Sequence, residues 1–144
     1  MSVEVEYCRG YAKFVVKRSV TMDKFQVTIL GCASAKPTFR HHPSSQVINF
    51  RDNLFMIDCG EGTQMQFARM RFKMNRLRHI FISHLHGDHC YGLPGLLSTI
   101  GLTGCGGRVT VHLPEEGVPL LKPLSTIRHM TWKWTLLLIA TEIT

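Results

Sequence analysis

The sequence predicts a layered α/β fold, in which helices cover a sheet. Strand-like and helix-like segments follow one another along the chain, which is the pattern of such a fold. Hydrophobic residues make up 44% of the sequence, enough for a packed core, so a disordered or low-complexity chain is excluded. The 144 residues suit one domain. The longest apolar run, Leu136 to Ala140, is far shorter than the roughly 18 residues of a membrane-spanning helix, so no membrane partner is expected.

Three strands are expected in the first half of the chain. Residues 25–30 alternate between apolar and polar side chains, and Gly31 ends this strand. Two further apolar runs lie at residues 46–50 and 54–57. The residues between them, Arg51-Asp52-Asn53, favour a turn, so these two runs are predicted to pair as a hairpin.

Helices and strands alternate in the second half. Thr63 can cap a helix that runs to about Met74 and buries methionine and phenylalanine side chains. A strand is predicted from His79 to Ser83, and Pro94 fits the first turn of a second helix. A last strand is expected over residues 108–113, where apolar and polar side chains alternate again.

The first residues differ from the rest of the chain. Residues 1–21 mix charged and apolar side chains without a clear period, and a regular pattern begins only at Met22. We therefore expect residues 1–21 to be a non-native or disordered extension, and residues 22–144 to form the domain.

The amino-acid composition indicates which class of partner the protein binds and in which cell compartment it lies. Seventeen Lys and Arg against ten Asp and Glu give a net charge of +7, which favours a polyanion such as nucleic acid as partner. The alternative is an ordinary basic surface that aids solubility. The five cysteines are scattered without a C-x-x-C pair, which is typical of reduced thiols in a cytoplasmic protein.

Three histidines and an aspartate lie within six residues at the end of a predicted strand. On an extended backbone, side chains two residues apart point the same way, so His84 and His86 can meet one metal ion. Gly87 permits a turn that directs Asp88 and His89 to a second position nearby. Imidazole and carboxylate ligands suit zinc and similar ions. The alternative, a surface loop with a capping aspartate, does not account for so dense a cluster.

Three stretches of the sequence resemble a known family. S-H-L-H-G-D-H is similar to the H-x-H-x-D-H signature of metallo-β-lactamase-fold proteins. The segments Ile29 to Thr38, Met56 to Gln64 and Ser83 to Leu97 narrow the resemblance to the ribonuclease Z family. The similarity extends over roughly residues 25–114.

The resemblance implies a fold and an activity. The fold is a metallo-β-lactamase-like αββα sandwich, of which this chain is expected to hold the N-terminal half. The activity is that of a zinc-dependent endoribonuclease, active as a homodimer, which removes the 3′ trailer from precursor tRNA and leaves a 3′-hydroxyl. The family places two zinc ions in its site, one at His84 and His86 and the other at Asp88 and His89, with Asp88 also the catalytic proton acceptor.

A second carboxylate is expected to support this site. Asp58 follows a predicted strand and precedes Gly60-Glu61-Gly62. It can hydrogen-bond a metal ligand or the loop that carries the ligands. The alternative, a carboxylate that caps the following helix, remains open.

Basic side chains are candidates for RNA contacts. Lys36 and Arg40 lie in a loop that resembles the family's region near the tRNA 3′ end, and we expect them to bind phosphates. Arg69, Lys73 and Arg76 share one face of the predicted helix and form a second candidate strip. Solvated basic side chains are the alternative for both groups.

The motif supplies fewer metal ligands than a complete site for two zinc ions needs. A catalytic zinc usually takes three protein ligands, so two ions ask for about six positions, whereas the motif supplies four. The family's remaining ligands have no matching positions here, and from about residue 130 the resemblance is lost. We therefore expect a truncated domain that is inactive alone. Two other functions stay open: another metallo-β-lactamase-fold hydrolase of a small ester or phosphodiester, and a non-catalytic fragment that binds zinc or RNA.

Overall fold

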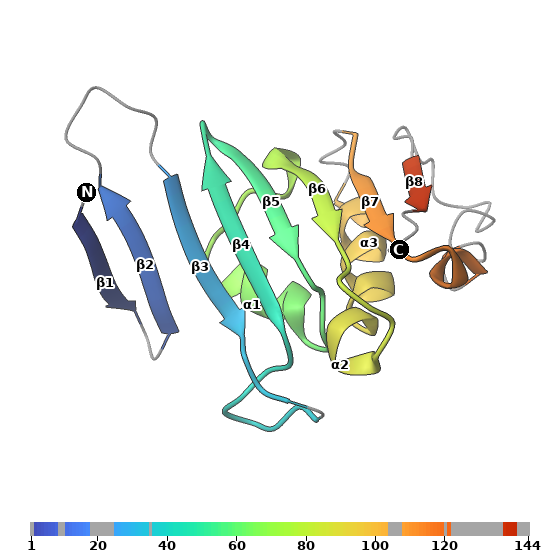
Figure 1. Ribbon diagram of the computed structural model, residues 1–144, viewed down its shortest axis with the longest axis horizontal. Coiled ribbons are helices and arrows are strands. Elements are labelled where there is room, and N and C mark those ends of the chain that lie inside the picture. Colours follow the sequence, from blue (N-terminus) through green and yellow to red (C-terminus); the bar gives the residue numbers. More distant parts are fainter. Residues whose placement is uncertain are drawn as a thin grey trace.

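A single sheet organises the chain in the computed structural model (Figure 1). The structure describes residues 2–8, 11–17, 25–34, 36–103, 108–119, 121 and 137–140, and for residues 2–8, 11–17 and 137–140 only the backbone is considered. The described strands form an eight-stranded sheet in the order of the sequence. Pairing is antiparallel from the first strand to the fifth and parallel from the fifth to the eighth.

The elements have the following bounds. The strands are β1 (Ser2–Cys8), β2 (Tyr11–Lys17), β3 (Phe25–Gly31), β4 (Ser45–Phe50), β5 (Asn53–Ile57), β6 (Leu77–Phe81), β7 (Thr110–Leu113) and β8 (Leu137–Ala140). The α-helices are α1 (Thr63–Arg69), α2 (Gly87–Cys90) and α3 (Leu93–Leu102), and short 3-10 turns occupy Met74–Arg76 and Glu115–Gly117.

The core lies between one face of the sheet and the helices, which stand behind it in Figure 1. Alternate strand residues such as Val47, Met56 and Ile80 are fully buried on this face. They pack with Phe67 of α1 and Leu96 of α3 in one hydrophobic cluster. Each such aliphatic or aromatic side chain contributes roughly 1.5–3 kcal/mol through its removal from water. The layered α/β fold is thus confirmed, with one helix layer and one sheet layer in the described residues.

The hairpin of β4 and β5 forms as the sequence predicts. Phe50 pairs with Asn53, and the two residues between them, Arg51 and Asp52, both have positive φ, at 49° and 62°. Two consecutive left-handed residues are the conformation that matches the twist of a two-residue hairpin.

Helix α1 is shorter than predicted. It ends at Arg69 because Arg71 takes a left-handed conformation, with φ of 57°, which no α-helix can continue. The prediction that the helix runs to Met74 was therefore wrong. Arg69, Lys73 and Arg76 do not share one helical face, since Lys73 and Arg76 lie beyond the helix.

The two ends of the chain are described only in part. The backbone at residues 2–8 and 11–17 forms β1 and β2, and β2 pairs with β3. That residues 1–21 are a non-native or disordered extension stays a prediction. The divergent tail from residue 130 falls mainly outside the described residues, apart from β8, which pairs with β7. Among the helices that the structure describes, none has the length and apolar character needed to cross a membrane.

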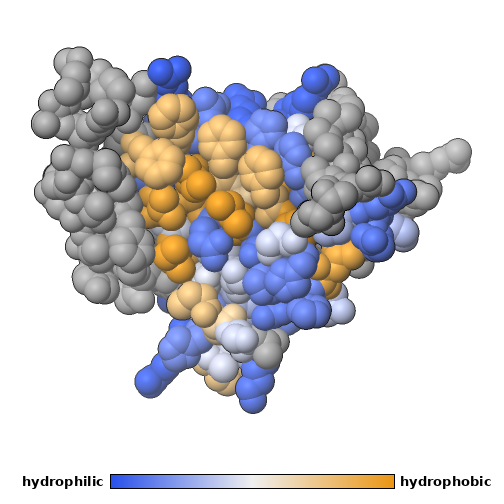
Figure 2. Space-filling model, in the orientation of Figure 1, coloured by the Kyte–Doolittle hydropathy of each residue, from blue (hydrophilic) through white to orange (hydrophobic). Residues whose placement is uncertain are grey.

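The second face of the sheet, turned away from the helices, has no layer over it in the described part of the chain. Figure 2 shows this face, on which apolar side chains gather. We call it the outward face. It is made by alternate residues of five strands: Phe25, Val27 and Ile29 of β3, Gln46, Ile48 and Phe50 of β4, Asn53, Phe55 and Ile57 of β5, His79 and Phe81 of β6, and His112 of β7.

Candidate metal centre

The predicted metal-binding residues meet at the carboxyl edge of the parallel strands. Asp58 follows β5, and the segment that carries the three histidines follows β6, which is parallel to β5. A backbone hydrogen bond from the Asp58 N–H to the Phe81 oxygen, at 2.8 Å, holds the two strand ends together. Parallel strands bring their carboxyl ends to one edge, which is where ligand sites form in such sheets.

The histidine segment folds into two donor pairs. His84 Nε2 lies 3.1 Å from His86 Nδ1, and His89 Nε2 lies 3.6 Å from the Asp88 Oδ2 atom. The rings of His84 and His89 are 4.0 Å apart between centroids, so the two pairs are adjacent. Extended backbone at His86 precedes helix α2, which carries Asp88 and His89. The structure therefore brings all four predicted ligands together.

Asp58 contacts the ring nitrogen of His89 that faces away from Asp88. Its Oδ2 atom lies 2.7 Å from His89 Nδ1, which leaves Nε2 facing Asp88. The carboxylate is buried and takes a left-handed conformation, with φ of 56°. A carboxylate that fixes the tautomer and direction of a histidine is a common support of metal ligands. Asp58 thus contacts a predicted ligand, whereas helix α1 has no side-chain cap; that Asp58 supports a metal site stays a prediction.

Hydrogen bonds keep Asp58 ionised. Burial by itself raises the pKa of this carboxyl, but the Ser83 N–H, His89 and the Ser83 hydroxyl together hold it below its ordinary value. Ser83 donates to Oδ1 from its backbone nitrogen at 2.9 Å and from its hydroxyl at 2.8 Å. The negative charge therefore persists in the position where it can accept a hydrogen bond from the His89 Nδ1–H group.

Two serines take part that sequence analysis did not assign. Besides Ser83, the Ser44 hydroxyl donates to Asp58 Oδ2 at 3.3 Å, and Gln46 Nε2 donates to the Ser44 oxygen at 3.1 Å. Ser83 directly precedes the histidine motif, and this position in the sequence was the one sign that it could take part in the site. Ser44 lies fourteen residues from Asp58 in the chain, so only the fold brings them together.

Glycines allow the close approach of the segments around the site. A Cβ atom on Gly92 would lie 2.0 Å from the Gly60 carbonyl oxygen, and one on Gly60 would lie 2.4 Å from the Asp88 oxygen. The Gly92 N–H donates to the Cys59 oxygen at 2.9 Å. Only glycine, which has no Cβ atom, permits this close backbone approach, which holds α2 with Asp88 and His89 against the end of β5.

The donor set fits zinc in part. Tetrahedral zinc holds nitrogen ligands at about 2.0–2.1 Å, which places two of them about 3.3 Å apart. The 3.1 Å between His84 and His86 and the 3.6 Å between His89 and Asp88 are close to this value. Within the described residues, however, no group of three or more His, Cys, Asp or Glu side chains can hold an ion. Each pair thus offers two donors where a closed site needs more.

The basic loop borders the same site. Lys36 and Arg40 are both exposed, and Thr38 holds the loop by accepting the N–H groups of Arg40 and His41 at 3.3 and 2.9 Å. A hollow of about 600 Å³ is lined by residues from this loop and from the ligand segment. They are Ser34, Pro37, Pro43, Glu61, His86, Gly87, Asp88 and Tyr91.

The remaining histidines and cysteines are not members of the donor pairs. His79 Nδ1 and His112 Nε2 are 3.0 Å apart on the outward face. Cys59 and Cys90 are buried free thiols and Cys32 is an exposed one. His129, Cys8 and Cys105 fall outside the residues whose side chains are described.

Comparison with known proteins identifies the family. The protein-family model described as "Anti-Pycsar protein Apyc1" matches residues 25–118, more than half of the chain. The chain belongs to this family. The matched residues include the whole of the ligand segment and the basic loop.

Curated relatives confirm the resemblance seen in the sequence. Ribonuclease Z of Parabacteroides distasonis is 57% identical over 106 residues, which are 74% of this chain and 35% of that protein. Ribonuclease Z of Bacteroides fragilis is 59% identical over 103 residues, 72% of this chain and 34% of that protein. The chain thus spans about a third of the length of the relatives it matches.

Solved structures confirm the metallo-β-lactamase-like fold. The short form of human tRNase Z aligns with a TM-score of 0.74 and 33% identity, over 85% of this chain and 47% of that one. A metallo-β-lactamase fold protein from Bacillus subtilis aligns with a TM-score of 0.63 over 82% of this chain and 46% of that one. At 19% identity, this second likeness concerns the fold alone.

Proposed function

We propose that this chain carries the first part of the zinc centre of an endoribonuclease that removes the 3′ trailer from precursor tRNA. The observation that carries the proposal is the pairing of His84 with His86 and of Asp88 with His89 at one sheet edge, with His89 oriented by Asp58. The high identity to proteins named ribonuclease Z supports it.

In this proposal, zinc is held by the four residues of the two pairs, and one of them, Asp88, also accepts a proton. Two zinc ions supply an activated water and positive charge beside the phosphodiester. The carboxylate of Asp88, a residue that lines the hollow, accepts the proton of the attacking water. Asp58 and Ser83 act through His89 and keep its Nε2 atom directed at Asp88. Cleavage then leaves a 3′-hydroxyl on the tRNA.

The proposal also covers the RNA substrate, the cell compartment and the oligomeric state of the protein. Lys36 and Arg40 are exposed in the loop that contributes Ser34 and Pro37 to the hollow, and they bind phosphates of precursor tRNA, for which the positive net charge is favourable. The complete protein is a homodimer, as the resemblance implies, and it is cytoplasmic, as the scattered cysteines indicate. The 144 residues alone do not cleave RNA, because each donor pair in the described part lacks a third ligand.

A chimaera tests this function. Residues 25–114 would replace the matched segment of Bacteroides fragilis ribonuclease Z, which supplies the rest of the site. We expect zinc-dependent cleavage at the 3′ trailer by the chimaera and none by the 144-residue chain. Asp88→Asn should lower kcat by roughly 100-fold or more, since it removes the proton acceptor. The matched control Asp52→Asn, in the β4–β5 turn, should leave kcat unchanged.

Two results would contradict the proposal. A folded, zinc-loaded chimaera that does not process precursor tRNA would exclude the function. Specific 3′ processing by the 144-residue chain would exclude the incomplete site.

The family model that matches the chain is described as "Anti-Pycsar protein Apyc1" and not as a ribonuclease. This description favours a second candidate function, a hydrolase of small molecules. The same preparations should therefore be assayed with small esters and cyclic phosphodiesters. Hydrolysis of these, without cleavage of tRNA, would favour a small-molecule hydrolase. Fewer than two bound zinc ions and no hydrolysis of any phosphodiester would favour a non-catalytic fragment.

A further inference from the structure

Four large apolar side chains are exposed in the described part of the chain outside the outward face. They are Phe39 at 108%, Met65 at 64%, Tyr91 at 65% and Leu102 at 73% of full exposure. Phe39 and Met65 line one hollow and Tyr91 lines another, whereas Leu102 lines neither of the two. Exposed apolar side chains that gather in this way mark a surface that binds another molecule.

The two hollows adjoin at the loop between β3 and β4. The hollow of about 600 Å³ contains Asp88, and the other, of about 670 Å³, lies between the loop and helix α1. We call the latter the α1 hollow; its walls include Phe39 of the loop and Met65 and Arg69 of α1. Pro37 lines both hollows, so they are neighbours. Figure 1 shows the loop at the same end of the sheet as α2, which carries Asp88.

Hydrogen bonds close the tip of the loop that displays Phe39. The Thr38 N–H donates to the His41 oxygen at 2.8 Å, and the His41 N–H donates to the Thr38 hydroxyl oxygen at 2.9 Å. Nearer the strands, the Ala33 N–H donates to the His42 oxygen at 2.9 Å. The Phe39 ring therefore stands on a closed turn, so little further ordering of the backbone is needed when a ligand binds to it.

The walls of the α1 hollow suit a flat aromatic ring that has a negative charge beside it. The exposed Phe39 ring can stack on such a ring, and the Met65 thioether adds a polarisable apolar surface. Arg69 is exposed and, among the described residues, has no carboxylate partner. A guanidinium group both stacks on flat rings and binds phosphate. A nucleotide combines these two chemical features, a flat base and a phosphate.

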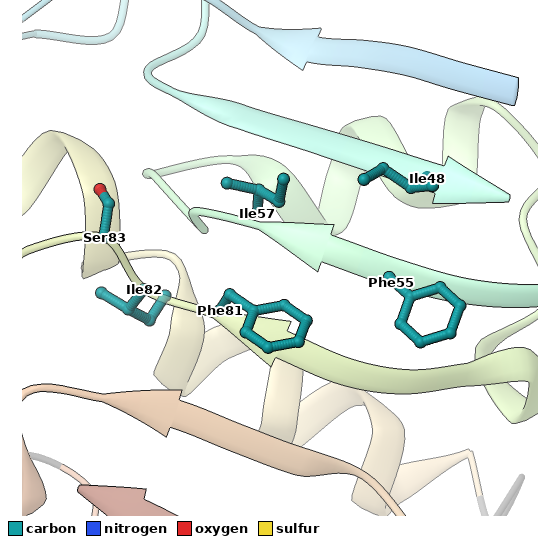
Figure 3. A pocket seen from close by; sticks show the side chains of 6 residues that line it. All are labelled: Ile48, Phe55, Ile57, Phe81, Ile82 and Ser83. Carbon is teal, nitrogen blue, oxygen red and sulfur yellow. The ribbon is translucent and has the colours of Figure 1, made fainter. Parts of the chain in front are cut away.

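The hollow of the outward face lacks these features. It measures about 330 Å³ and is lined by Ile48, Phe55, Ile57, Phe81, Ile82 and Ser83 (Figure 3). No charged side chain is among these lining residues, and none of them also lines the hollow that contains Asp88. A nucleotide is therefore matched by the α1 hollow and not by the outward face.

We propose that the α1 hollow binds the base of a nucleotide that flanks the cleaved bond, stacked on Phe39, with Arg69 beside the neighbouring phosphate. The inference rests on the proposed function, which puts the cleaved phosphodiester beside Asp88. Because the two hollows adjoin at Pro37, an RNA strand that enters one can continue into the other. Unpaired bases at RNA ends are commonly held by stacking on aromatic side chains.

Binding of a single-stranded oligoribonucleotide to the 144-residue chain tests the stacking without any cleavage. A 2-aminopurine base in the oligonucleotide should lose fluorescence when it stacks on Phe39. Phe39→Leu keeps an apolar side chain but removes the flat ring, so it should weaken binding by roughly 5-fold or more, whereas Phe39→Trp should preserve it. The matched control Leu102→Ala removes an exposed apolar side chain outside both hollows and should leave the affinity unchanged.

Cleavage by the chimaera locates the base. Precursor tRNA that lacks the base on one side of the cleaved bond should lose roughly 5-fold or more in kcat/KM, and removal of the base on the other side should have a smaller effect. With the more affected RNA, Phe39→Leu should cause no further loss, because the ring then has no base to stack on.

Several outcomes would overturn the inference. One is an unchanged affinity for the oligonucleotide in Phe39→Leu. Another is an equal loss of cleavage by Phe39→Leu with intact and base-free RNA, which is expected if the rest of the complete protein packs on Phe39. A third is a ribonucleoside monophosphate that binds as tightly as the oligonucleotide. A chimaera that cleaves no precursor tRNA would contradict the proposed function, while the oligonucleotide titration would still decide whether Phe39 stacks a base.

Discussion

At the scale of single residues, Asp58 connects the fold to the ligand segment. It receives hydrogen bonds from two serines and contacts His89 Nδ1, so one buried carboxylate orients a histidine that lies 31 residues further along the chain. The positive φ of Asp58 turns the chain sharply at the end of β5. Such a conformation is tolerated in a non-glycine residue where surrounding contacts fix it.

Asp58→Asn should therefore weaken zinc binding. The substitution keeps the size of the side chain but removes its charge, so the amide is a poorer acceptor for the His89 Nδ1 proton. We expect a loss of 10–100-fold in affinity, a typical effect of removing such a partner. Competition titration against a chromophoric chelator measures it on the chain as it stands.

The control for this prediction is Asp52→Asn. Asp52 forms an ion pair with Arg76 at the opposite end of the sheet, so its loss should leave zinc affinity unchanged. Equal zinc affinity in Asp58→Asn and the parent chain would show that Asp58 does not orient a ligand.

At the scale of elements, β6 and β7 are joined by a pair of histidines. The His79 and His112 nitrogens are 3.0 Å apart, and the His112 ring stacks on Phe81 with centroids 4.4 Å apart. Burial lowers the pKa of His112, and the charge of nearby His79 lowers it further. The folded state therefore favours the neutral form of His112.

The chain should lose stability as the pH falls below about 6.5, the ordinary histidine pKa. Below this value the unfolded chain takes up a proton at His112 before the folded chain does, so protonation favours unfolding until the pH passes the lower pKa of the folded state. His112→Phe, which keeps a stacked ring, should reduce this dependence. Urea unfolding at several pH values measures it.

His41→Gln is the matched control, because His41 is exposed and lies outside the β6–β7 pair. It should keep the pH dependence of the parent chain. If His112→Phe retained the full dependence between pH 8 and pH 5.5, the assignment to His112 would be wrong.

Helix α1 shows why element boundaries are hard to predict. The apolar spacing that predicts a helix to Met74 continues past Arg69, and the partly buried Met70, Phe72 and Met74 do pack against the core. They do so from a turn, because the left-handed Arg71 ends the helix and lets the chain return to begin β6. Periodicity records which side chains are buried and does not record the direction of the backbone.

At the scale of the whole molecule, charge should govern RNA binding. Lys36→Ala and Arg40→Ala each remove one exposed cation of the basic loop, so each should weaken binding of precursor tRNA and reduce the slope of log affinity against log salt by about 1. A filter-binding series at several salt concentrations measures both quantities.

Arg51→Ala is the control for this prediction. It also removes one positive charge, but at the β4–β5 turn, at the end of the sheet away from the metal edge. If it changed affinity and salt slope as much as Lys36→Ala, binding would depend on net charge alone and not on the basic loop.

The sequence by itself determined the strands β3 to β5, the hairpin between β4 and β5, and the four clustered donors, because these depend on residues close together in the chain. The proximity of His84, His86, Asp88 and His89 could be predicted since their spacing already limits where their side chains lie. The tertiary structure alone decided the rest. The contacts of Ser44 and Ser83 with Asp58, the approach of Gly60 to Gly92, and the uncovered apolar face arise only when distant strands pair, and no local pattern encodes a distance across a sheet.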